Sequence, residues 1–346
     1  MREPVVRAVD VGYGHVKYTL GRQADGTILC GSFPSLSPGV REVLDYGTYM
    51  ERRNTFIVEI DGRRYEVGKD VVKAVHANSE GSVMDIEFAM SDAYRARLYG
   101  ALNYIAQDLD DNTLDVLILG LPLNTYTKHK KALSARFTGE LTISGSGDTL
   151  QVRHCQTYPQ PFGSYLNYLE SNQISHFPVC LVVDIGYNTC DWFVCEGLTP
   201  RLSGVSLRGM GAVMNAMAKD VIQTTKFDGT ESEVMRLIDV ALTSGEQFKL
   251  CGKPVNLEKP QKVGEDIIEE GAQSVKNAVR SAGDIDVIIV TGGGAPFFKD
   301  AIQKKFRSHE VRLLTDSSLG NVRGFHVVGE NLGRSLSKAM ALGAAA

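Results

Sequence analysis

Two matching segments organise the sequence: Val9-Asp10-Val11-Gly12-Tyr13-Gly14 near its start and Val183-Asp184-Ile185-Gly186-Tyr187-Asn188 near its middle. Each consists of an apolar strand, an aspartate, an aliphatic residue, a glycine, a tyrosine and a small turn residue, and each is followed by a second apolar strand. The two aspartates lie 174 positions apart (184 minus 10) in a chain of 346 residues. An internal repeat of this length predicts two half-chains of like design.

The chemistry of this segment suits a phosphate ligand. Glycine lets the backbone approach a ligand closely, and successive N–H groups in a turn form a concave anion site. A carboxylate beside phosphate repels it unless a cation intervenes, so Asp10 and Asp184 imply Mg²⁺, held through water. A single segment of this kind is also an ordinary turn, but two matched copies favour a polyphosphate site.

Two further glycine segments extend this pattern. Thr291-Gly292-Gly293-Gly294 lies between a buried strand and a helix, where ligands of open α/β sheets bind; alone, it is equally a plain strand-to-helix turn. Gly209-Met210-Gly211 either lies beside the ribose or phosphates or simply begins a helix. The candidate nucleotide-binding residues are Gly12, Tyr13, Gly14, His15, Lys17, Gly186, Tyr187, Asn188, Thr189, Gly209, Gly211, Gly292, Gly293 and Gly294.

The regions around the repeat predict an α/β fold. Residues 5–33 and 179–207 each contain three short β-rich runs between turn signals, which predict antiparallel meanders. The apolar runs at 114–121 and 285–290 predict strands covered on both faces. Ser91 is expected to cap a helix whose apolar residues recur at helical spacing. The runs at 56–60 and 63–67, joined by Asp61-Gly62, predict a β-hairpin.

Composition excludes several other classes of protein. Hydrophobic residues make up 43% and charged residues 23%, which is too apolar for disorder. The net charge of -4 does not indicate a DNA-binding face. No signal peptide and no membrane-spanning run is expected, and the six cysteines form no CxxC pair or zinc-finger cluster, so we expect reduced thiols in the cytoplasm. No GxxxxGK[ST] loop is present, and Gly292-Gly293-Gly294 does not fit GxGxxG.

These pieces, in this order, resemble the actin/sugar-kinase/heat-shock-chaperone ATPase superfamily. Residues 10–17 look like its first phosphate loop, with Lys17 in the place of the phosphate-binding lysine of actins. Residues 184–191 look like the second phosphate loop, and 290–295 like the adenosine motif. Asn321-Val322-Arg323-Gly324-Phe325 is similar to the segment before the last helix of ParM/StbA-type actin-like proteins. A related subgroup in the PRTRC plasmid-type gene cassette remains an alternative.

The resemblance implies a duplicated, actin-like (ribonuclease H-like) fold. Each of two domains would hold a mixed sheet flanked by helices, with the nucleotide in the cleft between them. Domain I would comprise residues 1–156 and 326–346, with a small inserted subdomain at about 34–90. Domain II would comprise residues 157–325, with a helical inserted subdomain at about 211–282.

The resemblance also implies catalytic roles. Asp10 and Asp184 would hold the waters of Mg²⁺, and the substrate would be ATP, with GTP left open. Tyr158-Pro159-Gln160-Pro161 resembles the segment whose Gln or Glu orients the attacking water, so Gln160 is the candidate for that role. The alternative is that Gln160 is only a polar residue between prolines. The first loop departs from many relatives, since it carries Gly14-His15 where they carry Thr-Asn.

The function implied is a filament-forming ATPase that segregates plasmid or other replicon DNA. Its partners would be further copies of the chain, joined head to tail, and a DNA-binding adaptor on a centromere-like site. No direct contact with nucleic acid or membrane is expected. Two alternatives remain open: a small-metabolite kinase of the same superfamily, and a non-motor scaffold that binds nucleotide.

Overall fold

The computed structural model describes residues 2–40, 51–75, 87–174, 178–280 and 282–343. The chain divides into two compact units. The first contains the described residues up to 174 and those from Leu319 onward, and the second contains those from 178 to Ser318. Residues 157–174 and 319–325 thus pack with the first unit, whereas the predicted domain II began at 157 and ended at 325; those domain boundaries stay a prediction.

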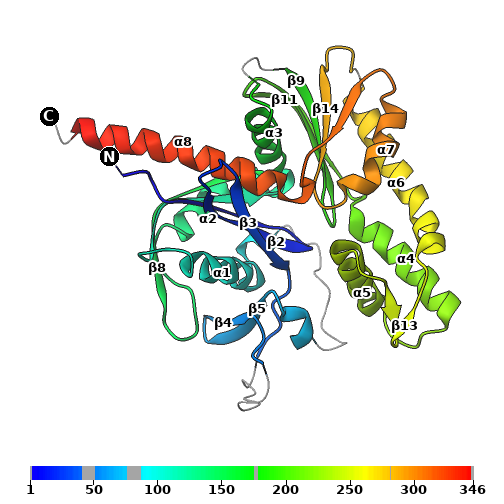
Figure 1. Ribbon diagram of the computed structural model, residues 1–346. Helices are drawn as coiled ribbons and strands as arrows, with labels where there is room; N and C mark the ends of the chain where they lie inside the picture. The colour runs from blue at the N-terminus through cyan, green and yellow to red at the C-terminus, as the bar shows by residue number, and fades with distance from the viewer. Residues whose placement is uncertain (1, 41–50, 76–86, 175–177, 281, 344–346) are drawn as a thin grey trace. The chain divides into compact units, whose positions relative to one another are not determined.

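Six strands form the sheet of the first unit, in the order β3-β2-β1-β6-β8-β7. Figure 1 labels β2, β3 and β8 of this sheet. The bounds of the six strands are Val6–Val11 (β1), His15–Arg22 (β2), Ile28–Pro34 (β3), Thr113–Leu121 (β6), Gly139–Thr142 (β7) and Thr149–Pro159 (β8). β1, β2 and β3 form the predicted antiparallel meander. β1, β6 and β8 run parallel, so their carboxyl ends share one edge of the sheet.

Both faces of this sheet are covered by helices. The helices are α1 (Asp92–Ala106), α2 (Leu123–Arg136), α3 (Gln160–Ser171) and α8 (Gly320–Gly343). Val9 and Leu119 belong to the core that contains side chains of α1 and α2. Ala8 and Ile118 point the other way and pack with Phe325 of α8. This alternation follows from the two-residue period of a strand and explains why β1 and β6 carry apolar residues on both faces.

The predicted hairpin around Asp61-Gly62 is confirmed. β4 (Thr55–Ile60) and β5 (Arg63–Gly68) pair antiparallel, and both contact α1. The predicted cap of α1 is also present, since Ser91 Oγ accepts a hydrogen bond of 3.1 Å from the N–H of Tyr94. Residues 41–50 and 76–86 of the predicted inserted subdomain lie outside the described residues.

The sheet of the second unit repeats the topology of the first. Its order is β11-β10-β9-β14-β15, with bounds Val179–Ile185 (β9), Cys190–Glu196 (β10), Thr199–Ser206 (β11), Val287–Thr291 (β14) and Glu310–Leu313 (β15). A meander is again followed by two parallel strands. The order matches β3-β2-β1-β6-β8 strand for strand, which confirms that the sequence repeat marks a structural duplication.

Four helices accompany this sheet: α4 (Met210–Thr225), α5 (Glu231–Ser244), α6 (Glu258–Val279) and α7 (Ala295–Lys305). Thr230 caps the start of α5, and Gly245 ends it in the left-handed conformation that favours glycine. α4 to α6 occupy the stretch of about 211–282 that was predicted to be a helical inserted subdomain; that it forms a separate subdomain stays a prediction. This stretch is interrupted by a short hairpin of β12 (Lys249–Leu250) and β13 (Lys253–Pro254), which the sequence pattern did not predict.

Within the first unit, α3 and α8 approach each other closely. A Cβ built on Gly324 would clash with the carbonyl of Gly163, so the crossing requires glycine. Asn321 Oδ1 accepts hydrogen bonds from the N–H and the hydroxyl of Ser164, at 3.2 and 2.6 Å. The segment from Asn321 to Phe325, singled out in the sequence, thus forms the contact between two helices.

A polar network ties α8 to β2. Thr19 Oγ1 lies 3.0 Å from His326 Nδ1, and Arg22 forms two hydrogen bonds of 2.9 and 2.8 Å to the carboxylate of Glu330. Burial alone would raise the pKa of Glu330, but the hydrogen bonds and charges of Arg22 and His326 outweigh it and lower the pKa to about 2. Glu330 therefore stays ionised at neutral pH and joins the helix to the sheet.

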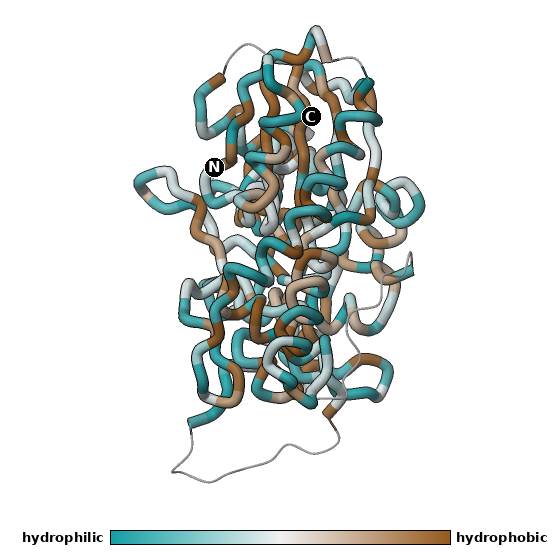
Figure 2. Tube along the Cα trace, turned by 90° about the vertical axis from the view of Figure 1, so that its right-hand side faces the viewer, coloured by the Kyte–Doolittle hydropathy of each residue, from teal (hydrophilic) through white to brown (hydrophobic). Residues whose placement is uncertain are grey.

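Hydropathy follows the amphipathic pattern expected of helices that cover a sheet. In Figure 2 the trace alternates between hydrophobic and hydrophilic residues along the helices. Of the helices in the described ranges, none combines the length and the apolar character needed to cross a membrane.

Candidate functional site

The first predicted turn lies at the carboxyl edge of the sheet of the first unit. Asp10 is only 2% exposed, and Lys17 lies opposite it on β2. The N–H of Gly12 donates a hydrogen bond of 3.2 Å to the carbonyl of His15, which closes the turn. A Cβ at position 12 would lie 3.6 Å from Lys17 Nζ, so the ammonium group lies beside the turn.

Gln160 joins this turn from a distant part of the chain. It is the first residue of α3, directly after β8, and its Nε2 donates a hydrogen bond of 2.6 Å to Asp10 Oδ1. Gly120, near the end of β6, has room for no side chain because a Cβ would lie 2.8 Å from the same oxygen. The parallel strands β1, β6 and β8 thus bring Asp10, Gly120 and Gln160 to one edge, where ligands of such sheets bind.

His15 has an unusual environment in this turn. Burial, and to a lesser extent the charge of Lys17, lowers the pKa of its imidazole to about 4. The ring is therefore neutral at physiological pH. A neutral imidazole can donate one hydrogen bond and accept another.

The second predicted turn has the same backbone geometry. The N–H of Gly186 donates a hydrogen bond of 2.8 Å to the carbonyl of Thr189, as Gly12 does to His15. Asp184 is 6% exposed at the end of β9. The two sequence segments therefore form equivalent hairpins, one in each unit.

The two further glycine segments meet this second turn. The N–H groups of Met210 and Gly211 donate to the carbonyls of Gly186 and Tyr187, at 2.9 and 2.6 Å. A Cβ on Gly292, which has a φ of +90°, would clash with Asp184 Oδ1. Glycine is needed there for both the backbone conformation and the close approach.

A side chain that the sequence analysis missed is Asp191. It is 2% exposed and lies directly opposite Asp184 on β10. Burial, and then the charge of Asp184, raises its pKa to about 8. In the first hairpin the position opposite the aspartate is a lysine, Lys17; in the second it is a carboxylic acid. Antiparallel pairing around the turn was the signal that could have identified it.

The residues around Asp184 fit a divalent cation. Two adjacent buried carboxylates repel each other, and Asp191 Oδ1 has no hydrogen-bond partner among the described residues. Mg²⁺ usually binds through one or two carboxylates, with waters and phosphate oxygens in the remaining positions. The parts of the chain that the structure describes contain no group of three or more His, Cys, Asp or Glu side chains that could hold a metal ion. This donor set suits a cation that arrives with a phosphate.

The structure therefore gathers the predicted residues into two groups, one in each unit. The first contains Asp10, Gly12, Tyr13, Gly14, His15, Lys17 and Gln160. The second contains Asp184, Gly186, Tyr187, Asn188, Thr189, Gly209, Gly211, Gly292, Gly293 and Gly294. Their role in binding nucleotide stays a prediction.

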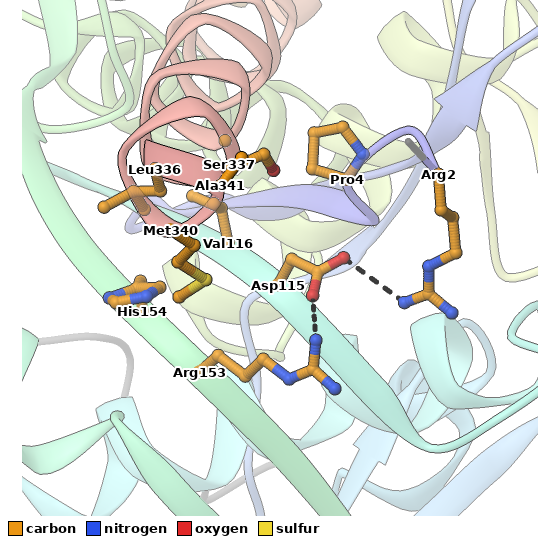
Figure 3. A pocket seen from close by; sticks show the side chains of 11 residues that line it. Arg2, Pro4, Asp115, Val116, Arg153, His154, Leu336, Ser337, Met340 and Ala341 are labelled. Carbon is orange, nitrogen blue, oxygen red and sulfur yellow. Dashed lines mark hydrogen bonds and ion pairs between the residues drawn. The ribbon is translucent and has the colours of Figure 1, made fainter. Parts of the chain in front are cut away.

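A pocket of about 430 Å³ lies at the opposite edge of the first sheet, by the start of β6 (Figure 3). Asp115 at this edge accepts hydrogen bonds from Arg2 and Arg153, at 3.4 and 2.6 Å. Leu336 and Met340 of α8 form an apolar wall. The charged groups of the pocket, Asp115, Arg2 and Arg153, pair with one another. None of the predicted nucleotide-binding residues lines the pocket.

Comparison with known proteins identifies the family. Residues 8–163 match the family model for the N-terminal domain of actin-like proteins. Residues 182–304 match the C-terminal model of the archaeal MreB-like actin homologue. No curated protein sequence matches the chain.

Solved structures give the same result at the level of the fold. The ADP complex of the archaeal actin homologue Ta0583 is 18% identical, with a TM-score of 0.71 over 94% of this chain and 99% of that chain. The apo psk41 ParM protein is 20% identical, with a TM-score of 0.67 over 96% and 99%. A ParM from Clostridium botulinum, solved as a 15-stranded filament, is 17% identical, with a TM-score of 0.67 over 95% and 100%.

The duplicated sheets, the paired aspartate–glycine turns and the two family matches all point to one group. Together the two matches cover well over half of the sequence, on either side of the repeat. The chain has the two-domain actin-like fold and belongs to the actin-like proteins.

Proposed function

We propose that this protein is a Mg²⁺-dependent ATPase that assembles into filaments. The observation that carries the proposal is the duplication of one phosphate-compatible turn. Each unit has a buried aspartate and a closed glycine turn at the carboxyl edge of its parallel strands. Two such turns suit the two sides of one Mg²⁺–nucleotide. The solved relatives include an ADP complex and a filament, which supports both parts of the proposal.

The proposed roles follow from the chemistry of the groups. Asp10 and Asp184 would hold the waters of the metal. Those backbone N–H groups of 12–15 and 186–189 that the turns do not use themselves would surround the phosphates. Lys17 neutralises phosphate charge, and the hydroxyl of Thr189 adds a hydrogen bond. When bound, Mg²⁺ would neutralise phosphate charge.

Gln160 is proposed to orient the attacking water. Its Nε2 is fixed by Asp10, so its Oε1 can accept a hydrogen bond from a water beside the phosphates. An amide is no strong base, but phosphoryl transfer depends mainly on positioning and electrostatics. The bond to Asp10 gives Gln160 a defined orientation, which a merely polar residue between prolines would lack.

Self-assembly is proposed to be head to tail, because a heterologous contact that does not close produces an open filament. Hydrolysis would then control filament stability. We further propose a cytoplasmic role in plasmid or replicon segregation through a DNA-binding adaptor, with ATP as substrate and GTP possible. The net charge of -4 fits a chain that does not bind DNA directly.

The test combines phosphate release with pelleting and electron microscopy in ATP, ADP, GTP or no nucleotide. We expect hydrolysis and nucleotide-dependent filaments from the wild type, and no turnover from Asp184→Ala. Asp300→Ala, at an exposed position, is the matched control and should hydrolyse normally. Normal phosphate release by Asp184→Ala would reject the site. Strong stimulation by added sugars would favour a kinase instead.

A further inference from the structure

The side chain of Tyr13, in the first turn, is held by an aromatic residue from a distant part of the chain. Its ring stacks on that of Phe88, with the centroids 4.9 Å apart and an interplanar angle of 26°. Phe88 begins a short 3-10 turn, η2 (Phe88–Met90), just before α1. Tyr13 lies between the two glycines of the turn, so a contact at this side chain acts on the most flexible part of the loop.

Phe88 is itself held by α1. The ring of Tyr94 meets it edge-on, at 5.7 Å between centroids and 82° between planes. The guanidinium carbon of Arg97 lies 5.0 Å from the centroid of the Phe88 ring. Arg97 is 6% exposed, and a cation–π contact is stronger when the cation is desolvated.

The backbone around Phe88 is fixed as well. The N–H and the hydroxyl of Ser91 donate to the carbonyl of Phe88, at 3.0 and 2.7 Å. The Glu87 carboxylate forms an ion pair with Lys128 of α2 and lies 3.7 Å from His129 Nε2. The Phe88 ring is therefore presented to Tyr13 from two helices of the same unit.

We propose that Phe88 is a positioning residue for the first phosphate loop. Its ring fixes Tyr13, and through Tyr13 it fixes the N–H groups of Gly14 and His15 before a ligand arrives. A loop ordered in advance loses less conformational entropy on binding, so its affinity is higher. The contribution to nucleotide affinity rests on the proposed function, but the ordering of the loop does not.

The first test measures amide hydrogen exchange of residues 11–16 in the full, nucleotide-free protein. Phe88→Leu keeps an apolar side chain but removes the ring, and we expect exchange about tenfold faster or more. Phe88→Tyr retains the ring, so residues 11–16 of this variant should exchange at the wild-type rate. Tyr13→Leu removes the other partner and should give the same acceleration.

The second test measures Mg²⁺–ATP binding and turnover. Phe88→Leu should weaken binding about tenfold and raise KM more than it lowers kcat. Because Phe88 acts through Tyr13, the double variant Phe88→Leu/Tyr13→Leu should bind Mg²⁺–ATP no more weakly than either single variant. Phe306→Leu is the matched control: Lys276 Nζ lies 4.5 Å from the ring centroid of Phe306 and His309 meets the ring edge-on, but in the second unit.

Wild-type exchange in Phe88→Leu would overturn the proposal, as would additive losses in the double variant or an equal loss of binding in Phe306→Leu. A wild-type protein that binds no nucleotide would reject the proposed function instead. Exchange in the unliganded chain would still decide whether Phe88 orders the loop.

Discussion

At the scale of single residues, the two hairpins differ in the partner of their aspartate. Asp10 faces Lys17, whereas Asp184 faces Asp191. The first pair combines opposite charges, and the second brings together two acids whose ionised forms repel. The two turns are thus alike in backbone but complementary in charge: the first carries a cation, which suits the proposed phosphate contact, and the second carries carboxylates, which suit the proposed metal contact.

Asp191 leads to a prediction about stability without metal. Its raised pKa means that the folded protein binds more protons than the unfolded chain between about pH 4 and pH 8, so its ionisation lowers stability as pH rises. Asp191→Asn removes this effect. Urea denaturation in EDTA measures the free energy of unfolding of both proteins. The value for the variant, relative to that for the wild type, should rise by about 1 kcal/mol or more from pH 5 to pH 8. A difference independent of pH would contradict this.

Gln160 provides a prediction about catalysis. Gln160→Ala should slow phosphate release tenfold or more, because it removes the amide that aligns water, while ATP affinity changes about threefold or less. Gln156→Ala, four residues earlier and exposed on β8, is the control and should behave as wild type. Equal losses of binding and turnover would assign Gln160 a purely structural role.

At the scale of elements, the sequence predicted those with strong local signals. Both meanders, the Asp61-Gly62 hairpin and the start of α1 carry turn residues or caps at fixed positions, and all are confirmed. The bond between Gln160 and Asp10 was not predictable, because it depends on β8 running parallel to β6. Asp191 carries no local signal of its own, because it faces Asp184 only once β9 and β10 pair across the second turn.

The crossing of α3 and α8 gives a prediction at this scale. Gly324→Ala places a Cβ against the carbonyl of Gly163, so the helices must separate. We expect a loss of about 2 kcal/mol or more in the free energy of unfolding. Gly283→Ala is the control, because a Cβ there meets no atom within 4 Å. Unchanged stability in Gly324→Ala would show that the contact is not close in solution.

The link between β2 and α8 gives a pH-dependent prediction. The folded-state pKa of Glu330 is lowered to about 2. Its contribution to stability is therefore complete above the pKa of the unfolded chain and is lost as pH falls toward 2. Glu330→Gln should cost about 1–2 kcal/mol at pH 7, since the charged hydrogen bonds are partly exposed to solvent. Denaturation at pH 3.5 should show a smaller difference, and a constant difference would rule out the ionised contact.

At the scale of the whole molecule, duplication explains why one short repeat was so informative. The repeat marks equivalent positions in two sheets of the same strand order, so recognising it predicted the fold of both halves. The repeat did not predict that α3 and the start of α8 belong to the first compact unit. That division depends on the contact of Gly163 with Gly324, far apart in sequence.

The central claim is that Asp10 and Asp184 serve one Mg²⁺–nucleotide. Calorimetric titration of Mg²⁺–ATP into the wild type, Asp10→Asn and Asp184→Asn tests it most directly. We predict one nucleotide per chain, with affinity reduced tenfold or more in each variant. Wild-type affinity in either variant would contradict the account.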